Sequence, residues 1–487
     1  MRIAVIGAGP VGIFFTKLCL DNNLSVTLVE SGNEHNESSH LTKKNYIFNS
    51  PSALPEGVHR VGGGSTLWRA RLSEFQESDF LHLDNDRVWP FSKSELEVHY
   101  KKVYKLLNAG DLTDHEVIDQ YFGNEKKILP KEYELRTFRF CDPRFFINLF
   151  KDISNHENLE ILTDHYCNRI FRNATSGELS IQLTPRSLNP ISREFDKVII
   201  ACGALQSTAL LQRSPMLSSK NMSSALGRNL MEHCEGFIGN LTVKNTFEKN
   251  LFSKLSLDIF NRANNELNGI GIAISNHVVS SNKLINVHYE IRKFMPRFYF
   301  RALKNVKKNY FLIMQSLAII EKYSYFIYRK IRTIYDIIFR IKRFSIYLKA
   351  EELPYINSKL ELDNYNPSIS NYKHRISNES YQLISKDIKQ FQENFQKNYS
   401  SKLKLYRTTM NLSKNLSCFG PNWHPMGTTR MGIETSASVC NENLEIHADK
   451  DCFILSASVF PSGSNSNPTF TTLALASRLS DYIVKGS

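Results

Sequence analysis

The sequence predicts an α/β protein in which a Rossmann-like nucleotide-binding domain is accompanied by a second domain that contains a sheet. Two observations, one near each end of the chain, support this prediction. The first twelve residues, MRIAVIGAGPVG, have the pattern of a short buried strand, a glycine turn and the start of a helix. Near the other end, His424 and Asn467 lie in one block rich in glycine, proline and small polar residues, and they form a candidate catalytic pair.

Length and composition favour a globular protein with two cores. The chain has 487 residues, and hydrophobic side chains make up 41% of it, which is normal for globular domains. Its eight cysteines show no C-x-x-C or metal-type spacing, so we expect reduced thiols and no metal site. The first apolar strand begins close to Met1 and leaves no room for a secretory signal, so we expect a cytoplasmic protein.

The first thirty residues predict a strand–helix–strand unit. Strands are expected at Ile3–Ile6 and Ser25–Val29, with a helix between about Val11 and Asn22. Farther along, Lys197–Ile200 has the pattern of another buried strand, and the helix after it extends through Leu211. We expect this later strand to return to the same sheet as the first two.

Three glycines in the first unit have distinct tasks. Gly7 permits a tight turn, Gly9 lets the backbone approach a pyrophosphate, and Gly12 lets the helix pack close to the strand. The pyrophosphate would lie at the helix N-terminus, where free N–H groups favour an anion. Glu30, at the end of the second strand, can accept hydrogen bonds from both hydroxyls of an adenosine ribose. The unit therefore indicates a dinucleotide site, although it does not distinguish FAD from NAD.

A second glycine cluster spans Gly62–Gly64 and is followed by Ser65. Successive glycines expose backbone N–H groups, which suits the close approach of a flat ring or a phosphate. A flexible surface loop is the alternative interpretation of the same residues.

The positive charge of the chain is concentrated in residues 289–349. This segment holds fifteen Lys or Arg and three acidic residues, an excess of 12 in a chain whose net charge is +13. No recognised nucleic-acid module accompanies it, so we do not expect nucleic-acid binding. Residues 236–283 instead alternate apolar and polar side chains and are expected to form sheet strands.

Within the basic segment, isoleucines recur at spacings of three and four and predict the apolar face of an amphipathic basic helix: Ile327, Ile331, Ile334, Ile338 and Ile341. The simplest hypothesis is that this face docks onto the second domain and leaves the Lys and Arg side chains in solvent. The alternative is that the segment rests on an anionic membrane surface, as a peripheral contact on the inner face of the membrane.

Together these motifs resemble those of the glucose-methanol-choline (GMC) oxidoreductases. The resemblance rests on segments that occur in the family's order: the N-terminal glycine motif with Glu30, the Gly62–Gly64 loop, Gly203 to Leu211, Gly227 to His233, and Asn422 to Ile483. It implies a discontinuous FAD-binding domain made of residues 1–89, 141–235 and 411–487. The substrate domain would then comprise residues 90–140 and 236–410, with a basic helical insertion at about 289–349.

The resemblance also implies an activity, in which a hydride moves from the CH–OH group of an alcohol, such as a sugar or polyol, to flavin N5 of FAD. On the matching positions, His424 is the base and Asn467 donates a hydrogen bond to the alcohol oxygen; a neutral imidazole can accept a proton near pH 7. Beyond the first glycines and Glu30, it implies cofactor contacts at Gly63, Gly64, Ser65, Ala457, Ser458, Asn467, Pro468 and Thr469. Asn467 precedes a proline, so capping of the following helix is its alternative role.

Two departures from the family pattern concern the cofactor. Some relatives attach FAD covalently through a histidine, but the corresponding residue here is Leu67, so we expect non-covalent FAD. Ser456 stands where many relatives carry an aspartate, and it would make a weaker polar contact to the cofactor.

Other functions stay open. A lyase on the same fold would use His424 for acid–base work without redox change, and a nicotinamide-dependent dehydrogenase would use the same N-terminal unit. A membrane-associated scaffold would keep only the fold. The sequence identifies neither the alcohol nor the electron acceptor, which could be O2, a quinone or a protein.

Overall fold

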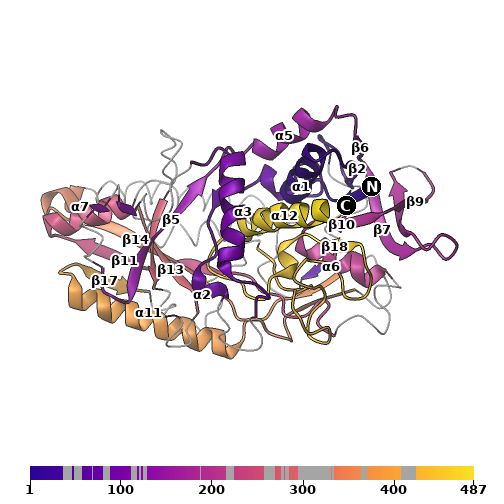
Figure 1. Ribbon diagram of the computed structural model, residues 1–487. Coiled ribbons are helices and arrows are strands. Elements are labelled where there is room, and N and C mark those ends of the chain that lie inside the picture. Colours follow the sequence, from indigo (N-terminus) through magenta and orange to yellow (C-terminus); the bar gives the residue numbers. More distant parts are fainter. Residues whose placement is uncertain are drawn as a thin grey trace, which may run out of the picture.

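The computed structural model of the chain shows two main sheets that lie in different halves of the molecule (Figure 1). It describes residues 1–36, 46–48, 58–68, 70–80, 88–110, 118–119, 122–123, 129–186, 188–214, 224–256, 269–275, 279, 285–293, 331, 334–362, 370–406 and 424–486. The α/β fold class predicted from the sequence is confirmed, because one sheet is parallel and the other is antiparallel.

The first sheet is parallel and has the strand order β18-β10-β1-β2-β6. Its strands are β1 (Arg2–Ile6), β2 (Ser25–Val29), β6 (Leu159–Leu162), β10 (Lys197–Ile200) and β18 (Cys452–Ile454). Strands β1, β2 and β10 lie where the apolar runs predicted them, and β10 pairs directly with β1. Helices cover the sheet, and that is why these strands are continuous apolar runs.

Helices around this sheet form the first core. They are α1 (Pro10–Asp21), α3 (Lys93–Leu106), α5 (Phe145–Ile153), α6 (Gly203–Arg213) and α12 (Pro468–Lys485). Helix α12 packs against α1 on one side and α3 on the other. The apolar side chains of α3 therefore belong to the first core, whereas the sequence analysis grouped residues 90–140 with the second domain. The domain boundaries stay a prediction.

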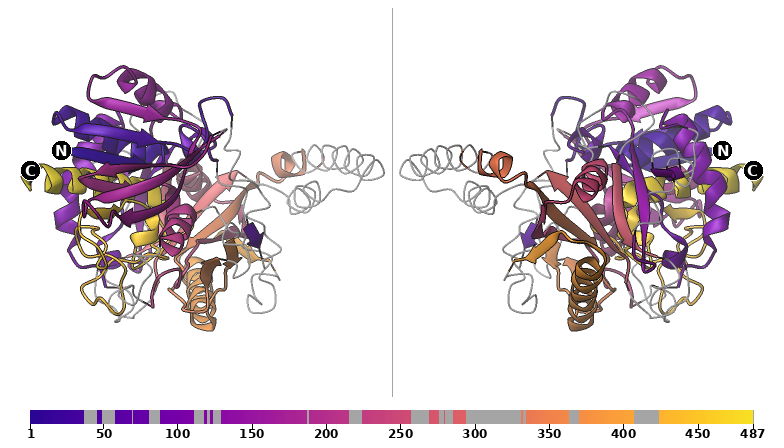
Figure 2. Two further views of the ribbon diagram at one scale, coloured as in Figure 1. Left: turned by 90° about the vertical axis from the view of Figure 1, so that its right-hand side faces the viewer. Right: turned by 90° about the vertical axis from the view of Figure 1, so that its left-hand side faces the viewer.

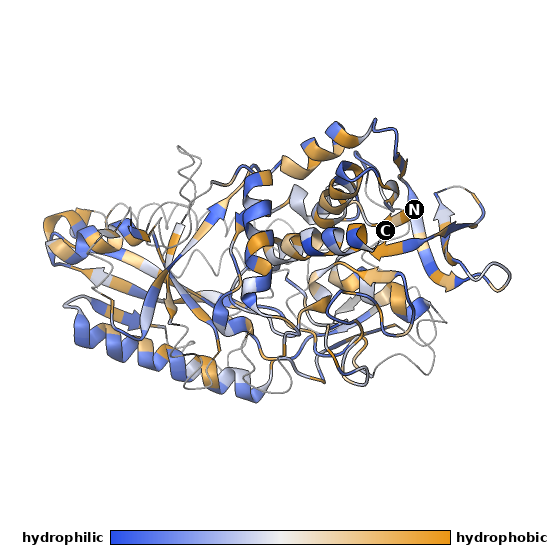
Figure 3. Cartoon of the chain, in the orientation of Figure 1, coloured by the Kyte–Doolittle hydropathy of each residue, from blue (hydrophilic) through white to orange (hydrophobic). Residues whose placement is uncertain are grey.

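The second sheet has the strand order β17-β11-β14-β13-β12-β5-β4. Its strands are β4 (Arg71–Leu72), β5 (Tyr133–Phe140), β11 (Cys234–Val243), β12 (Gly269–Ile274), β13 (Val287–Lys293), β14 (Lys342–Ala350) and β17 (Lys402–Leu405). Helix α11 (Asn378–Asn398) packs against it, and the ring of Phe391 stacks on Tyr289 with centroids 3.8 Å apart. Hydropathy alternates along α11 in Figure 3, as expected for a helix with one buried face.

Smaller elements complete the described part of the chain. One small sheet consists of β7 (His165–Arg172), β8 (Leu179–Pro185) and β9 (Ile191–Phe195). Another consists of β3 (Tyr46–Phe48), β15 (Lys359–Leu362) and β16 (Ser370–Lys373). Short helices are η2 (Gly63–Thr66), α2 (Glu77–Phe80), α7 (Thr246–Leu255) and η6 (Ala457–Val459). Helix α7 interrupts residues 236–283, where the sequence predicted strands alone; Asn245 caps it by accepting from Glu248 N.

The basic segment also differs from its prediction. Its two ends are the paired strands β13 and β14 of the second sheet. Of the predicted amphipathic helix, Ile327 lies outside the described residues, and residues 334–338 are helical. This helical stretch projects beyond the strand ends of the second sheet in Figure 2.

The isoleucine stripe is not docked on the second domain. Ile331, Ile334 and Ile338 are 63%, 58% and 67% exposed, so that hypothesis is wrong for these three residues. Sequence periodicity shows which residues share a helix face, but it does not show what the face contacts. No helix within the described ranges combines the length and the apolar character that crossing a bilayer requires.

Candidate functional site

The turn between β1 and α1 has the shape of a dinucleotide cradle. Gly7 has a φ of 109°, a conformation that favours glycine. A Cβ on Gly12 would lie 1.9 Å from the Gly7 carbonyl oxygen, so a side chain there would push the helix off the strand. A Cβ on Gly9 would meet nothing within 4 Å. The N-terminus of α1 therefore has open space at Gly9, where a pyrophosphate could contact the helix N–H groups.

The Glu30 carboxylate is held at the edge of this cradle. It is 7% exposed and accepts hydrogen bonds from the backbone N–H of Ala8 at 2.9 Å and of Gly32 at 3.0 Å. The second glycine cluster joins the same turn, because Gly62 N donates to Ala8 O at 2.8 Å. This hydrogen bond holds the Gly62–Gly64 cluster against the turn between β1 and α1, so the alternative of a flexible surface loop is not supported.

The remaining residues of the η2 turn face in different directions. Ser65 is buried, and its Oγ donates to Gly62 O at 2.6 Å, which closes the turn. A Cβ on Gly64 would meet nothing within 4 Å. Leu67 is 70% exposed. The turn thus presents backbone at Gly63 and Gly64 beside the α1 N-terminus.

The predicted C-terminal cofactor residues lie at two helix starts. Ala457 and Ser458 form η6, and the Ser458 Oγ accepts from Thr429 Oγ1 at 2.6 Å. Pro468 and Thr469 form the first turn of α12, with Pro468 buried and Thr469 half-buried. The backbone amides of these turns can face a bound anion or a polar ring edge. With the N-terminal cradle, they fit the phosphates, ribose and ring of FAD.

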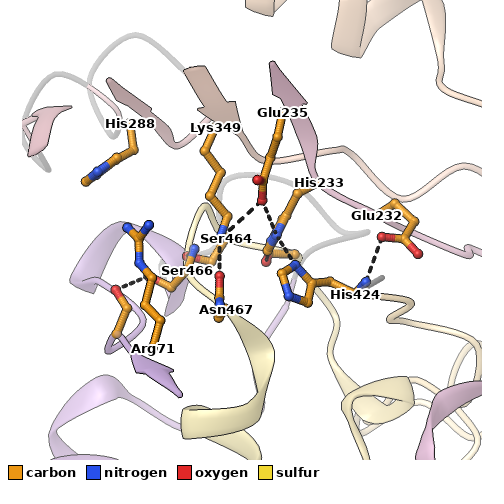
Figure 4. Close-up of polar contacts among 12 residues, drawn as sticks. Arg71, Glu232, His233, Glu235, His288, Lys349, His424, Ser464, Ser466 and Asn467 are labelled. Carbon is orange, nitrogen blue, oxygen red and sulfur yellow. Dashed lines mark hydrogen bonds and ion pairs between the residues drawn. The ribbon is translucent and has the colours of Figure 1, made fainter. Parts of the chain in front are cut away.

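Two segments far apart in the sequence bring two histidines together. Met231 and Met426 exchange backbone hydrogen bonds of 3.0 Å in both directions. This pairing places His233 beside His424, with Nδ1 to Nδ1 at 3.1 Å (Figure 4). His233 ends the segment from Gly227 to His233 that resembles the family, but no role was predicted for it from the sequence.

The hydrogen bonds of His233 determine the tautomer of His424. His233 Nε2 lies 3.1 Å from Gly463 O, and a carbonyl only accepts, so this nitrogen carries the proton. Burial, chiefly, lowers the pKa of His233, so the ring is neutral and its Nδ1 is an acceptor. His424 Nδ1 must therefore donate the 3.1 Å bond. The neutral His424 ring then has its lone pair on Nε2, the atom a general base uses.

Asn467 is held by a lysine from the second sheet. It occupies the N-cap position of α12, but its side chain makes no capping hydrogen bond, so the capping alternative is not supported. Instead its Oδ1 accepts from Lys349 Nζ, which also lies 3.4 Å from Glu235 Oε1 (Figure 4). Glu235 Oε1 is in turn 3.6 Å from His233 Nδ1. A chain of polar contacts thus connects Asn467 to His424 through three residues.

Charges in this chain of contacts compensate one another. Burial opposes ionisation of Glu235, but the Lys349 ammonium outweighs it and holds the pKa of Glu235 well below its usual range. Burial lowers the pKa of Lys349 to about 8, although Glu235 opposes the shift. Burial, with help from His233 and Lys349, holds the pKa of His424 well below its ordinary value. His424 is consequently neutral at pH 7.

A metal ion is an alternative occupant for part of this cluster. Ligand atoms of His233, Glu235 and His424 lie within 4.8 Å of one another. However, the Lys349 ammonium lies 3.4 Å from the Glu235 oxygen that a cation would need, and it would repel the cation. We therefore interpret the cluster as a set of buried polar contacts and not as a metal site.

Neighbouring strands carry a second set of buried charges. Glu290 pairs with Arg71 and with Arg292, whose Nε lies 2.8 Å from Glu290 Oε2. These cations outweigh the effect of burial and lower the pKa of Glu290. The Arg292 guanidinium stacks 3.5 Å from the ring centroid of Tyr347, and Tyr347 donates to Glu235 at 2.7 Å. Strands β11, β13 and β14 thus form a buried polar wall next to the catalytic pair.

Glu235 and Lys349 could not be identified from the sequence, because their proximity depends on strand register. Glu235 of β11 is the direct partner of Lys349 of β14, and His288 of β13 is the partner of Lys349 on the other side. Cross-strand partners lie on the same face of a sheet. Without the register, Lys349 is one of fifteen basic residues in a segment that the sequence analysis interpreted as solvated or membrane-facing.

Comparisons with known proteins identify the family. Two models described as GMC oxidoreductase match residues 147–235 and 366–476. A 2-methyl-1,2-propanediol dehydrogenase from Mycolicibacterium austroafricanum is 41% identical over 63 residues, 13% of this chain and 11% of that protein. The chain thus matches only about a tenth of that relative's length.

Solved structures show the same fold over the whole chain. Pyridoxine 4-oxidase from Mesorbium loti has a TM-score of 0.61 at 14% identity, covering 99% of this chain and 98% of that one. A fungal aryl-alcohol oxidase has a TM-score of 0.57 at 11% identity, with 99% and 98% covered. Identities this low establish the fold alone, whereas the two family models match two separate segments of the sequence itself, residues 147–235 and 366–476. The chain belongs to the GMC oxidoreductase family.

Proposed function

We propose that this protein is an FAD-dependent oxidoreductase that oxidises the CH–OH group of an alcohol, with His424 as the base. The observation that carries the proposal is the hydrogen bond between His424 Nδ1 and His233 Nδ1, 3.1 Å long, because it leaves the lone pair of His424 on Nε2. An alcohol becomes a good hydride donor only as its hydroxyl proton leaves, so a neutral imidazole is the group this reaction needs.

FAD supplies the hydride acceptor, at N5 of its ring. Its pyrophosphate would lie at Gly9 on the α1 N-terminus, its ribose at Glu30, and its ring near the η2 turn and the start of α12. Leu67 offers no nucleophile for a covalent bond to the flavin, which supports non-covalent binding.

His424 and Asn467 would share the alcohol oxygen. His424 Nε2 would take the hydroxyl proton, and the positive charge that results would lie near the Glu235 carboxylate, whose Oε1 is 3.6 Å from the His233 Nδ1 that accepts from His424. Asn467 Oδ1 is occupied by Lys349, so its amide N–H groups point away from the lysine and can donate to the oxygen. Donors placed before the reaction stabilise the negative charge that develops on the oxygen.

The substrate is an alcohol whose wider structure is open. The solved relatives are named for pyridoxine and for aryl alcohols, and the curated relative for a diol. We extend to this chain only the feature these names share, an oxidisable hydroxyl, with sugars and polyols as the first class to test. The cytoplasmic location expected from the sequence stays a proposal, as does the alternative of a peripheral contact with the inner face of the membrane.

The test is anaerobic reduction of the bound flavin by a panel of sugars, polyols, aromatic alcohols and lipid-linked alcohols. We expect the yellow absorbance of the flavin to bleach with at least one class. Turnover of a substrate without any bleaching would instead favour the lyase. Copurification of nicotinamide without flavin absorbance would favour the nicotinamide-dependent dehydrogenase.

A further inference from the structure

Lys349 is the only side chain in the described part of the site that hydrogen-bonds the amide oxygen of Asn467. Its side chain is 3% exposed, and β14 fixes its position between β11 and β13. Burying the charged amine of a lysine costs free energy, because the charge loses its contact with water, unless the amine is paired and hydrogen-bonded. Glu235 compensates one part of that charge at 3.4 Å. The other contact is made to a residue of the catalytic pair.

The contact determines which way the Asn467 amide faces. A protonated amine can donate hydrogen bonds but cannot accept one from the amide nitrogen Nδ2 of Asn467. It therefore favours the amide orientation in which Oδ1 faces Lys349. The two N–H donors must then face the opposite side. A rotated amide would present its oxygen to the developing negative charge of the alcohol and would repel it.

We propose that Lys349 is a positioning residue, which keeps Asn467 oriented as a hydrogen-bond donor to the alcohol oxygen. This inference rests on the proposed function and adds the residue that determines which side of the Asn467 amide faces the alcohol. It also assigns a task to Glu235, whose carboxylate holds the Lys349 ammonium beside Asn467.

The inference predicts a basic limb in the pH profile. Burial lowers the pKa of Lys349 to about 8, and a neutral amine no longer selects one amide orientation. The rate of flavin reduction should therefore fall as pH rises through about 8. Titratable or charged groups face Lys349 from each neighbouring element: Glu235 and His233 of β11, His288 and Glu290 of β13, Arg71 of β4, and His424.

The experiment compares Lys349→Met and Lys349→Arg with the parent holoenzyme across pH 6 to 10. We expect Lys349→Met to slow flavin reduction on the order of tenfold at pH 7 and to lose the basic limb. Lys349→Arg should restore most of the rate and move the limb to higher pH, because a guanidinium stays charged. Lys404→Met, at an exposed lysine of β17 in the same sheet, is the matched control.

A double-substitution cycle separates positioning from general stability. If Lys349 acts through Asn467, Lys349→Met should cause little further loss when Asn467 is already alanine. Binding of the unreactive aldehyde or ketone product, followed by the flavin absorbance shift, should weaken in parallel. If Lys349→Met keeps the rate and the pH profile of the parent, the inference about Lys349 is wrong while the proposed function stands. The same holds if Lys349→Met and Lys349→Arg lose equal fractions of the rate. A parent enzyme that no alcohol reduces overturns the proposed function instead.

A separate observation concerns the exposed stripe beyond the second sheet. Five apolar side chains there are more than half exposed: Ile331, Ile334, Ile337, Ile338 and Phe339. Monomeric proteins rarely leave contiguous apolar residues of this size in water. Arg340 and Lys342, next to them in the chain, are also exposed.

We infer that this surface rests on an anionic lipid bilayer. Charge complementarity selects this occupant, because apolar side chains enter the interface while nearby cations attract anionic headgroups. Such a contact would hold the alcohol-oxidising site near membrane-delivered substrates or a membrane-borne electron acceptor.

Vesicle sedimentation tests this surface. We expect the holoenzyme to sediment with vesicles rich in anionic lipid, less with neutral vesicles, and less again at high salt. The double variant Ile334→Ser/Ile338→Ser should bind roughly tenfold more weakly, whereas Ile433→Ser, at an isoleucine that is 71% exposed elsewhere, should not. Equal, negligible sedimentation throughout overturns the inference. A dimer that the double variant dissociates, without vesicle binding, assigns the surface to a second copy and also overturns it.

Discussion

The cofactor half and the catalytic half of this site are built in different ways. The cofactor half takes its main residues, Gly7, Gly9, Gly12 and Glu30, from one strand–helix–strand unit. The catalytic half collects its residues from separate places: His233 and Glu235 on or beside β11, Lys349 on β14, His424, and Asn467 before α12. Local sequence therefore specifies the first half, whereas sheet register and loop pairing specify the second.

The largest expected effect falls on the catalytic half. His424→Ala should slow flavin reduction by at least about 100-fold, the usual contribution of a positioned base, while FAD stays bound. Stopped-flow reduction by the best alcohol of the panel measures the rate, and absorbance measures the bound flavin. His447→Ala is the control, because His447 contacts Ser438 outside the site. Unchanged reduction in His424→Ala would show that the base is another residue.

Two glycine substitutions divide the cofactor half into a structural and a binding part. Gly12→Ala brings a Cβ within 1.9 Å of the Gly7 oxygen, so it should reduce the free energy of unfolding, by about 3 kcal/mol. Gly9→Ala meets no atom within 4 Å, so it should leave the melting temperature of the FAD-free protein unchanged and weaken FAD binding. Equal melting temperatures for the two variants would contradict this division.

Glu30 tests whether the cofactor half works independently of the catalytic half. Glu30→Ala should weaken FAD retention roughly tenfold or more, because a charged acceptor for the ribose is lost. Saturating FAD should then restore most of the reduction rate. Acid precipitation of the parent should release all of its FAD, since Leu67 offers no covalent anchor; flavin left on the precipitated chain would refute non-covalent binding.

The smallest expected effect is the change in the rate of flavin reduction as the pH falls below 7. His424 acts as a base only when neutral, and burial lowers its pKa well below 6.5. Protonation, which abolishes the base, therefore occurs only as pH falls below that ordinary value. The rate of flavin reduction should stay level from pH 7 down past 6.5 and decline at lower pH. A midpoint at 6.5 or above would indicate a solvent-exposed histidine as the base.

Much of the fold could be predicted from the sequence because its signals are local. The apolar runs of β1, β2 and β10 and the glycine spacing specify a parallel sheet within short windows. Helix α7 was missed because its cap and turn chemistry lies within an alternating segment. Strand character was predicted from Ile346 onward, in the second half of β14, but β13 and the start of β14 were missed because charged residues alternate with apolar ones along them, and only the paired register shows which side is buried.

The candidate site divides in the same way. His424 and Asn467 could be identified because the block from Asn422 to Ile483 resembles that of the GMC oxidoreductases, although the sequence left capping as an alternative for Asn467. Lys349 could not, because a lysine in a strongly basic segment carries no sign of its burial until β11 and β14 are paired. His233 lies between these cases, since its motif is visible but its partner, His424, is brought close by the pairing of Met231 with Met426.

Anaerobic reduction of the bound flavin by an alcohol deuterated at its carbinol carbon is the decisive measurement. If a hydride leaves that carbon as His424 takes the hydroxyl proton, the protiated alcohol should bleach the flavin, and deuteration should slow bleaching several-fold. The same isotope effect should persist in Lys349→Met at a lower rate, because positioning changes the barrier without changing the bond that breaks. Product formation with the flavin fully oxidised and no isotope effect would contradict alcohol oxidation at this site.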